Sequence, residues 1–150
     1  MLDKFSDKWS IWGLFFKVEA EITVNSLDGM AEEWMNVFHF TNTNDDGGKI
    51  PALYINKNGY FHLYACGSDL TQFNFKLGKK YHIVLQQYQF DDNVIAEIKI
   101  NGMTIKVTEN NQAQSLMGVK LYISDPWHPV AFTSKYGFLE NFKVTKYSKY

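Results

Sequence analysis

The sequence feature that most limits the fold is a ten-residue segment in which apolar and polar side chains alternate without a break. Between Phe16 and Asn25 the even positions hold Phe, Val, Ala, Ile and Val, and the odd positions hold Lys, Glu, Glu, Thr and Asn. A period of two residues puts successive side chains on opposite faces of a β-strand. The segment therefore predicts a strand with one buried face and one solvated face.

Further β-rich runs follow this segment and are separated by turn formers. They cover residues 34–41, 52–57, 60–65, 81–90, 94–100, 103–108, 118–124 and 138–146. The dipeptides Asn58-Gly59 and Asn101-Gly102 are strong hairpin signals because both residue types accept a positive φ. Only residues 26–33 and 111–117 leave room for a helical turn or two. This pattern predicts one all-β sandwich or barrel over residues 1–150, with its core at about 16–147.

The apolar positions of these runs give the expected core between the sheets. It comprises Phe16, Val18, Ala20, Ile22, Val24, Val37, Phe61, Ile83, Leu85, Ile98, Ile100, Leu121, Ile123, Phe142 and Val144.

Charge and cysteine content exclude several classes of partner. The 15 basic and 16 acidic residues give a net charge of −1, which provides no overall attraction for nucleic acid or anionic lipid. The longest uncharged run near the start, residues 9–16, is too short for a signal peptide or a membrane span. Cys66 is the only cysteine, so neither an intrachain disulfide nor a thiolate zinc site is expected. Composition leaves the compartment and the oligomeric state open.

Four short motifs resemble a known superfamily. Residues 77–85 (LGKKYHIVL) and 96–102 (AEIKING), with the closing pair 119–125 (VKLYISD) and 137–144 (GFLENFKV), are similar to motifs of laminin G-like and pentraxin-like modules of the concanavalin A-like lectin superfamily. The resemblance implies a two-sheet antiparallel jelly-roll sandwich, an extracellular location and roles in carbohydrate binding or cell adhesion. The chain lacks the cysteine pair of laminin G modules and the sugar signatures of galectins, so no particular sugar is implied.

Catalytic motifs are weak in this sequence. Glu19 and Glu21 come nearest to the paired carboxylates of a glycoside hydrolase, but they lie on the expected solvated face of a strand. The four histidines show no metal-ligand spacing, and Cys66 has no base beside it in the sequence. We therefore expect a protein that is not an enzyme, with a polysaccharide-acting glycoside hydrolase as the least favoured alternative.

Two loops carry the residues that a binding site would use. Residues 42–48 (NTNDDGG) are rich in oxygen ligands, which calcium prefers, although the same residue types also form ordinary Asx turns. In residues 125–129 (DPWHP), two prolines flank a tryptophan that either presents a rigid platform or folds back over the core. The expected metal ligands are Asp45, Asp46 and Asp125, and the expected ligand-binding residues are Trp127, His128 and Asn44.

These features favour a recognition or adhesion module that binds a glycan or a protein partner through one rim of loops, with calcium as the expected ion. A structural or oligomerisation domain with the same sandwich is the alternative.

Overall fold

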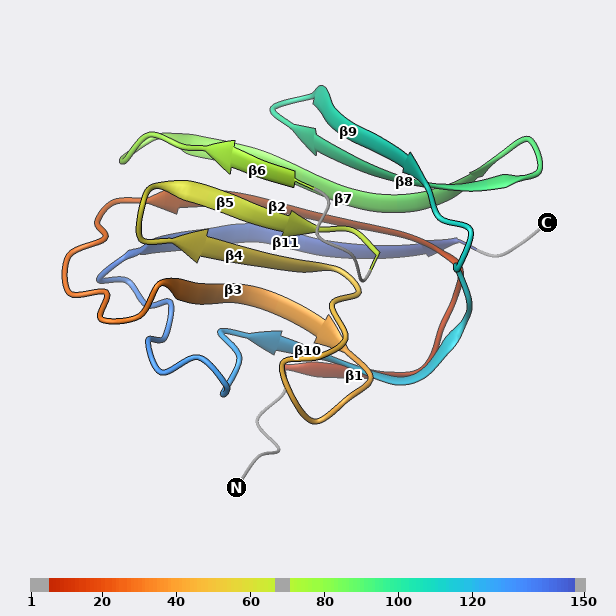
Figure 1. The fold of residues 1–150 in the computed structure, drawn as a ribbon, viewed down its shortest axis with the longest axis horizontal. Coiled ribbons are helices and arrows are strands. Elements are labelled where there is room, and N and C mark those ends of the chain that lie inside the picture. Colours follow the sequence, from red (N-terminus) through yellow and green to blue (C-terminus); the bar gives the residue numbers. More distant parts are fainter. Residues whose placement is uncertain (1–5, 67–70, 148–150) are drawn as a thin grey trace.

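The predicted strands form two antiparallel sheets that pack face to face (Figure 1). The computed structural model describes residues 6–66 and 71–147, and these residues contain no helix. Sheet A has the strand order β1-β10-β3-β4-β5-β6, and sheet B has the order β11-β2-β7-β8-β9. The all-β, two-sheet sandwich expected from the sequence is therefore confirmed.

The strands of sheet A are β1 (Asp7–Trp12), β3 (Trp34–Thr41), β4 (Ala52–Asn56), β5 (Tyr60–Tyr64), β6 (Thr71–Asn74) and β10 (Leu116–Ile123). The strands of sheet B are β2 (Phe15–Val24), β7 (Lys80–Phe90), β8 (Asn93–Ile100), β9 (Met103–Glu109) and β11 (Gly137–Tyr147).

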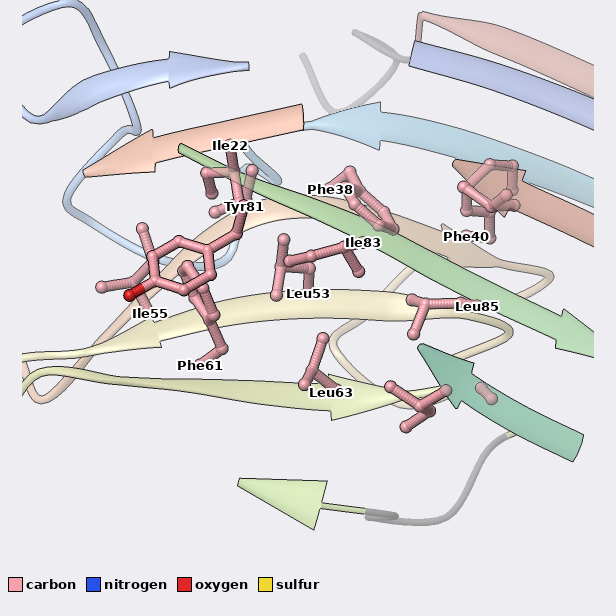
Figure 2. Close-up of a cluster of buried hydrophobic side chains, with 14 of the residues drawn as sticks. Ile22, Phe38, Phe40, Leu53, Ile55, Phe61, Leu63, Tyr81, Ile83 and Leu85 are labelled. Carbon is pink, nitrogen blue, oxygen red and sulfur yellow. The ribbon is translucent and has the colours of Figure 1, made fainter. Parts of the chain in front are cut away.

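The core lies between the two sheets and consists of aliphatic and aromatic side chains (Figure 2). Twelve of the fifteen residues expected there are buried, and Phe142 and Val144 are half-buried against the same cluster. The expectation for Ile123 is wrong, because this side chain is 38% exposed. Ile123 is the last residue of β10, and a side chain at a strand end has fewer neighbours to cover it.

Both Asn-Gly dipeptides lie in hairpin turns, but the two turns differ. Asn101 and Gly102 have φ values of 52° and 78°, as the mirror-image two-residue turn requires. At the other hairpin only Gly59, with φ of 89°, is left-handed, and its N–H donates to the carbonyl oxygen of Asn56. This second loop contains three residues, 57–59, because Asn56 pairs with Tyr60.

Two strands of sheet A were not expected from the sequence. β1 pairs with β10, so the sandwich includes residues before position 16, and β6 adds a short edge strand next to β5. The two segments with helical potential, 26–33 and 111–117, form turns and bends, and the second runs into β10. None of the residues that the structure describes belongs to a helix capable of crossing a membrane.

The outer face of sheet A carries polar and aromatic side chains rather than an apolar surface. In β4 and β5 the core residues Leu53 and Leu63 alternate with Tyr54, His62 and Tyr64, which point to the opposite face. Residues 42–51 follow β3, and residues 124–136 follow β10. Because β3 and β10 are antiparallel neighbours, these two segments leave their strands in opposite directions. Contacts described below show that they meet over its outer face.

Candidate functional site

A recess of about 300 Å³ lies over the outer face of sheet A. This volume is at the lower end of the range for small-molecule sites, about 300–1,000 Å³. Strands β3, β4 and β5 and both covering segments contribute to its walls. The lining residues are Trp34, Asp46, Lys49, Tyr54, His62, Tyr64 and His128.

Aromatic rings form one side of the recess. His62 and Tyr64 lie two residues apart on β5, and their rings are parallel with centroids 5.0 Å apart. The rings of Trp34 and His62 meet edge-on, with centroids 4.7 Å apart. The rings of Tyr54 and Tyr64 also meet edge-on, with centroids 5.9 Å apart. The register of the sheet explains the arrangement, since Tyr54 and His62 are directly opposite each other on β4 and β5.

Charged groups lie beside these rings. The Lys49 ammonium is 5.7 Å from the centroid of the Tyr54 ring and 5.5 Å from that of Tyr64, within the range of cation–π attraction. It also lies 3.7 Å from Oδ1 of Asp46. The recess therefore combines apolar ring surface with one cationic and one anionic side chain.

A buried polar network adjoins the recess and centres on Asp125. Its Oδ1 accepts hydrogen bonds from the backbone N–H groups of Trp127 and His128, both at 3.2 Å, and lies 2.8 Å from Nδ1 of His128. Its Oδ2 lies 3.0 Å from Nδ1 of His39 in β3. The backbone N–H of Asp125 donates to Oδ1 of Asn36 at 2.8 Å. These contacts fix the segment after β10 on sheet A.

His39 joins this network to the segment after β3. Its side chain is fully buried, and Nε2 donates to the carbonyl oxygen of Gly48 at 2.6 Å. The Tyr54 hydroxyl lies 3.3 Å from Nδ1 of His39 and donates to Oδ1 of Asp46 at 2.9 Å. His39, Asp46 and Asp125 thereby place one ring nitrogen and two carboxylate oxygens within 4.8 Å of one another.

Burial and hydrogen bonding shift the pKa values of three groups in this network. Burial raises the pKa of Asp125, but hydrogen bonds from His128 and His39 outweigh it and hold that pKa well below its usual range. Burial alone would lower the pKa of His128, but the Asp125 carboxylate raises it on balance. Burial, followed by the charge of Asp46, raises the pKa of Tyr54 far above that of an exposed phenol. Tyr54 thus remains protonated.

The structure brings together only some of the residues expected to form the site. Asp46 and Asp125 both approach His39, and His128 lines the recess beside Asp46. The two segments leave their strands in opposite directions and meet over the face of sheet A. The expectation of a single loop rim stays a prediction.

Asn44 and Asp45 lie in the same segment but outside this group. The carboxylate of Asp45 accepts hydrogen bonds from the Thr43 hydroxyl and the Gly47 N–H, both at 2.8 Å, as in an Asx turn. These two bonds lower the pKa of Asp45. The amide oxygen of Asn44 accepts a hydrogen bond from the Lys120 ammonium. Neither side chain lines the recess.

Trp127 covers the outer face of sheet A instead of forming an open platform. Its half-buried ring packs edge-on against the rings of Tyr122 and His39, with centroid distances of 4.9 Å and 5.7 Å. The tryptophan thus folds back onto the sandwich, but onto the outer face of a sheet and not onto the core.

Sequence reasoning missed the strand residues of the site. His39 was read as an isolated histidine, because its carboxylate partner comes 86 positions later. The alternation Tyr60-Phe61-His62-Leu63-Tyr64 in β5 was an available signal. Once Phe61 and Leu63 face the core, the three remaining rings must share the outer face.

Glu19 and Glu21 lie on the outer face of sheet B. Glu19 forms ion pairs with Lys17 at 3.1 Å and His82 at 3.6 Å. Glu21 pairs with Lys80 at 3.4 Å and accepts a hydrogen bond from the Asn141 amide, and these interactions lower its pKa. Both glutamates are thus placed in a surface network of lysine and histidine partners.

Comparison with known proteins gives the fold. No family model matches the chain, and no curated protein matches it. Among solved structures, a Trypanosoma rangeli sialidase superposes with a TM-score of 0.58 at 16% identity, covering 87% of this chain and 20% of the sialidase. Alginate lyase AlgAT5 of polysaccharide lyase family 7 superposes with a TM-score of 0.56 at 14% identity, covering 92% of this chain and 63% of the lyase.

The carbohydrate-binding module CBM66 from Bacillus subtilis gives a lower TM-score of 0.47 at 12% identity, covering 93% of this chain and 77% of the module. The chain spans about a fifth of the sialidase, and at these identities the shared property is the fold. The finer resemblance to laminin G-like and pentraxin-like modules stays a prediction. The chain has a two-sheet antiparallel jelly-roll sandwich fold.

Proposed function

We propose that this protein is a non-catalytic module that binds a glycan in the recess over sheet A. The observation that carries the proposal is the combination of ring surface with hydrogen-bonding groups in one small concavity. The C–H faces of a sugar pack against aromatic rings, and its hydroxyl groups exchange hydrogen bonds with charged and polar side chains. Tyr64, Lys49 and Asp46 would provide these two kinds of contact.

The size of the recess favours a short ligand. A volume of about 300 Å³ suits one sugar unit or the end of a chain better than an extended polysaccharide. The Lys49 ammonium adds a preference for a sugar with a carboxylate, because a charge-assisted hydrogen bond is stronger than a neutral one.

Two residues of the network, Tyr54 and Asp125, are poorly suited to acid–base catalysis. A general acid or base works best when its pKa lies near the operating pH. The pKa of Tyr54 is raised far above neutral and that of Asp125 is lowered far below it, so neither group is suited to exchange protons during turnover.

The names of the structural neighbours agree with a carbohydrate ligand. A sialidase and an alginate lyase share this fold with the chain, and both act on carbohydrates by name. The same proposal includes an adhesion role outside the cell, calcium-assisted binding and a protein ligand as further expectations.

A glycan array followed by calorimetric titration tests the proposal. The array is probed with and without a chelator, and the strongest glycan is then titrated into the wild type and two variants. Tyr64→Ala removes a ring from the recess, whereas Tyr147→Ala removes a 46% exposed ring at the end of β11 and serves as the matched control. We expect Tyr64→Ala to weaken binding about tenfold or more, and Tyr147→Ala to leave it unchanged.

The outcomes separate the alternatives. Equal loss in both variants would place the glycan elsewhere, and an array without any bound glycan would favour a structural or oligomerisation domain. Release of shorter sugars from a bound polysaccharide would show that the protein is an enzyme. Binding lost with chelator and restored by calcium would support the calcium expectation.

A further inference from the structure

We propose that His39, Asp46 and Asp125 bind one divalent transition-metal ion of the zinc class. Nδ1 of His39, Oδ1 of Asp46 and Oδ2 of Asp125 are the ligand atoms. The ion would lie beside the recess, where Asp46 is part of both sites. The inference does not depend on glycan binding, because the metal alone is the ligand.

The three ligand atoms are close to the spacing that such an ion needs. Nδ1 of His39 lies 3.0 Å from Oδ2 of Asp125 and 4.0 Å from Oδ1 of Asp46. Zinc bonds of about 2.0–2.2 Å in a tetrahedral arrangement put neighbouring ligand atoms roughly 3.3–3.5 Å apart. Asp46 has to move inward, and its side chain is 45% exposed on the segment after β3. Nδ1 of His39 and Oδ2 of Asp125 have to move slightly apart.

A separate observation, the orientation of the His39 ring, directs Nδ1 at the other two ligand atoms. Nε2 carries a proton, because it donates to the carbonyl oxygen of Gly48. Nδ1 on the other side of the ring lies 3.0 Å from Oδ2 of Asp125, where the two atoms form a buried hydrogen bond. A metal ion bound to both atoms would take the place of the shared proton, which is released when the metal binds.

The surrounding groups orient the ligand atoms as outer-shell partners do in metal sites. A metal-binding histidine commonly donates its other N–H to a backbone carbonyl, as His39 does to Gly48. Asp125 has its second oxygen, Oδ1, held by donors from Trp127 and His128, which leaves Oδ2 directed at His39. Tyr54 differs, because its hydroxyl donates to Oδ1 of Asp46, the ligand atom itself, and so fixes the position of that oxygen.

The donor types select the class of metal. Calcium takes six to eight oxygen ligands, whereas this group offers one imidazole nitrogen and two carboxylate oxygens. That set suits zinc and neighbouring first-row metals, and three protein ligands leave a coordination position for water or another oxygen ligand. Asp45, which was expected to bind calcium, contributes nothing to this set because its carboxylate belongs to a turn.

Metal titration of the intact protein tests the inference. Chelator-treated protein is titrated with ZnCl₂ and separately with CaCl₂ by calorimetry, and Co²⁺ absorption reports nitrogen and oxygen coordination. Asp46→Asn removes a half-exposed anionic ligand and spares the buried His39 and Asp125. Asp45→Asn is the matched control, since it removes the same charge one residue away and its amide oxygen still accepts the turn hydrogen bonds. Thermal unfolding of each variant in chelator checks that the fold is intact.

We expect one Zn²⁺ per chain, an affinity for Zn²⁺ well above that for Ca²⁺, and a loss of about tenfold or more in Asp46→Asn but not in Asp45→Asn. The inference is overturned by the absence of zinc binding, by equal affinities in the wild type and Asp46→Asn, or by a preference for calcium. The glycan proposal is tested by a different variant, Tyr64→Ala, so the glycan proposal and the metal proposal can fail separately.

Discussion

Nδ1 of His39 lies 3.0 Å from Oδ2 of Asp125, although 86 positions separate the two residues in the chain. The contact joins the middle of β3 to the segment that follows β10, and neither side chain is exposed to solvent. Since Asp125 also binds two backbone N–H groups of its own segment, this one carboxylate holds the covering segment on sheet A.

Replacing Asp125 should therefore destabilise the protein strongly. Asp125→Ala leaves His39 and two backbone donors without their acceptor, and breaking a buried pair of this kind costs about 3–5 kcal/mol. Urea denaturation measures the change in the free energy of unfolding. Asp28→Ala, at an exposed position in a turn, should stay within about 0.5 kcal/mol. If Asp125→Ala lowered the free energy of unfolding as little as Asp28→Ala, the network would contribute little to stability.

Trp127→Ala should lower stability as well as affect any ligand. The ring packs on Tyr122 and His39, and removal of a half-buried aromatic ring with two such contacts should cost about 2 kcal/mol. Thermal unfolding compares this variant with Phe138→Ala, whose ring is 50% exposed. If the two variants unfold alike, the tryptophan is a solvated platform, as one reading of the sequence suggested.

Gly137→Ala should be among the most damaging single changes in the described part of the chain. A Cβ atom at Gly137 would lie 2.0 Å from the carbonyl oxygen of Thr23, in the backbone of β2. Because backbone cannot move aside as a flexible side chain can, we expect a loss of about 3 kcal/mol. Gly13→Ala meets nothing within 4 Å and should be neutral or slightly stabilising. Chemical denaturation of both variants checks the contrast.

Glu97 should make stability depend on pH in the acid range. Burial raises its pKa, but hydrogen bonds from Thr104 and Gln86 outweigh burial, so the pKa is lower in the folded than in the unfolded protein. A lowered carboxyl pKa adds stability above the unfolded-state value, about 4.3, and this stability is lost as pH falls through the folded-state value.

Glu97→Gln should consequently show a shallower fall in the free energy of unfolding below about pH 4.3 than the wild type. Denaturation curves collected at a series of acid pH values give both slopes. If the free energy of unfolding fell equally steeply with pH in both proteins, protonation of Glu97 would not be coupled to unfolding.

The sandwich could be predicted because its strands have strong local signals. The alternation of β2 and the Asn-Gly turns encode half-buried strands and hairpins within a few residues. The sequence did not predict β1 and β6, because edge strands have short or irregular patterns, and β1 depends on a partner that is distant in the sequence. Trp9 pairs with Val119, more than one hundred residues later.

The site was harder to predict for the same reason. The sequence indicated Asp46, Asp125 and His128, because loops rich in polar residues and proline can be recognised from their local composition. His39 and Tyr54 lie inside strands, and their role depends on which segments fold over sheet A. No local pattern contains that information.

The strand order also determines when the recess can exist during synthesis of the chain. β10 lies between β1 and β3, so the first strand has no partner in sheet A until residues near 120 have left the ribosome, and Asp125 follows them. Pairings over such sequence distances slow folding. A nascent or truncated chain that ends before this point contains Trp34, Tyr54, His62 and Tyr64 but lacks His128 and cannot complete the recess. Any ligand of this site therefore recognises the finished fold and shifts the folding equilibrium towards it.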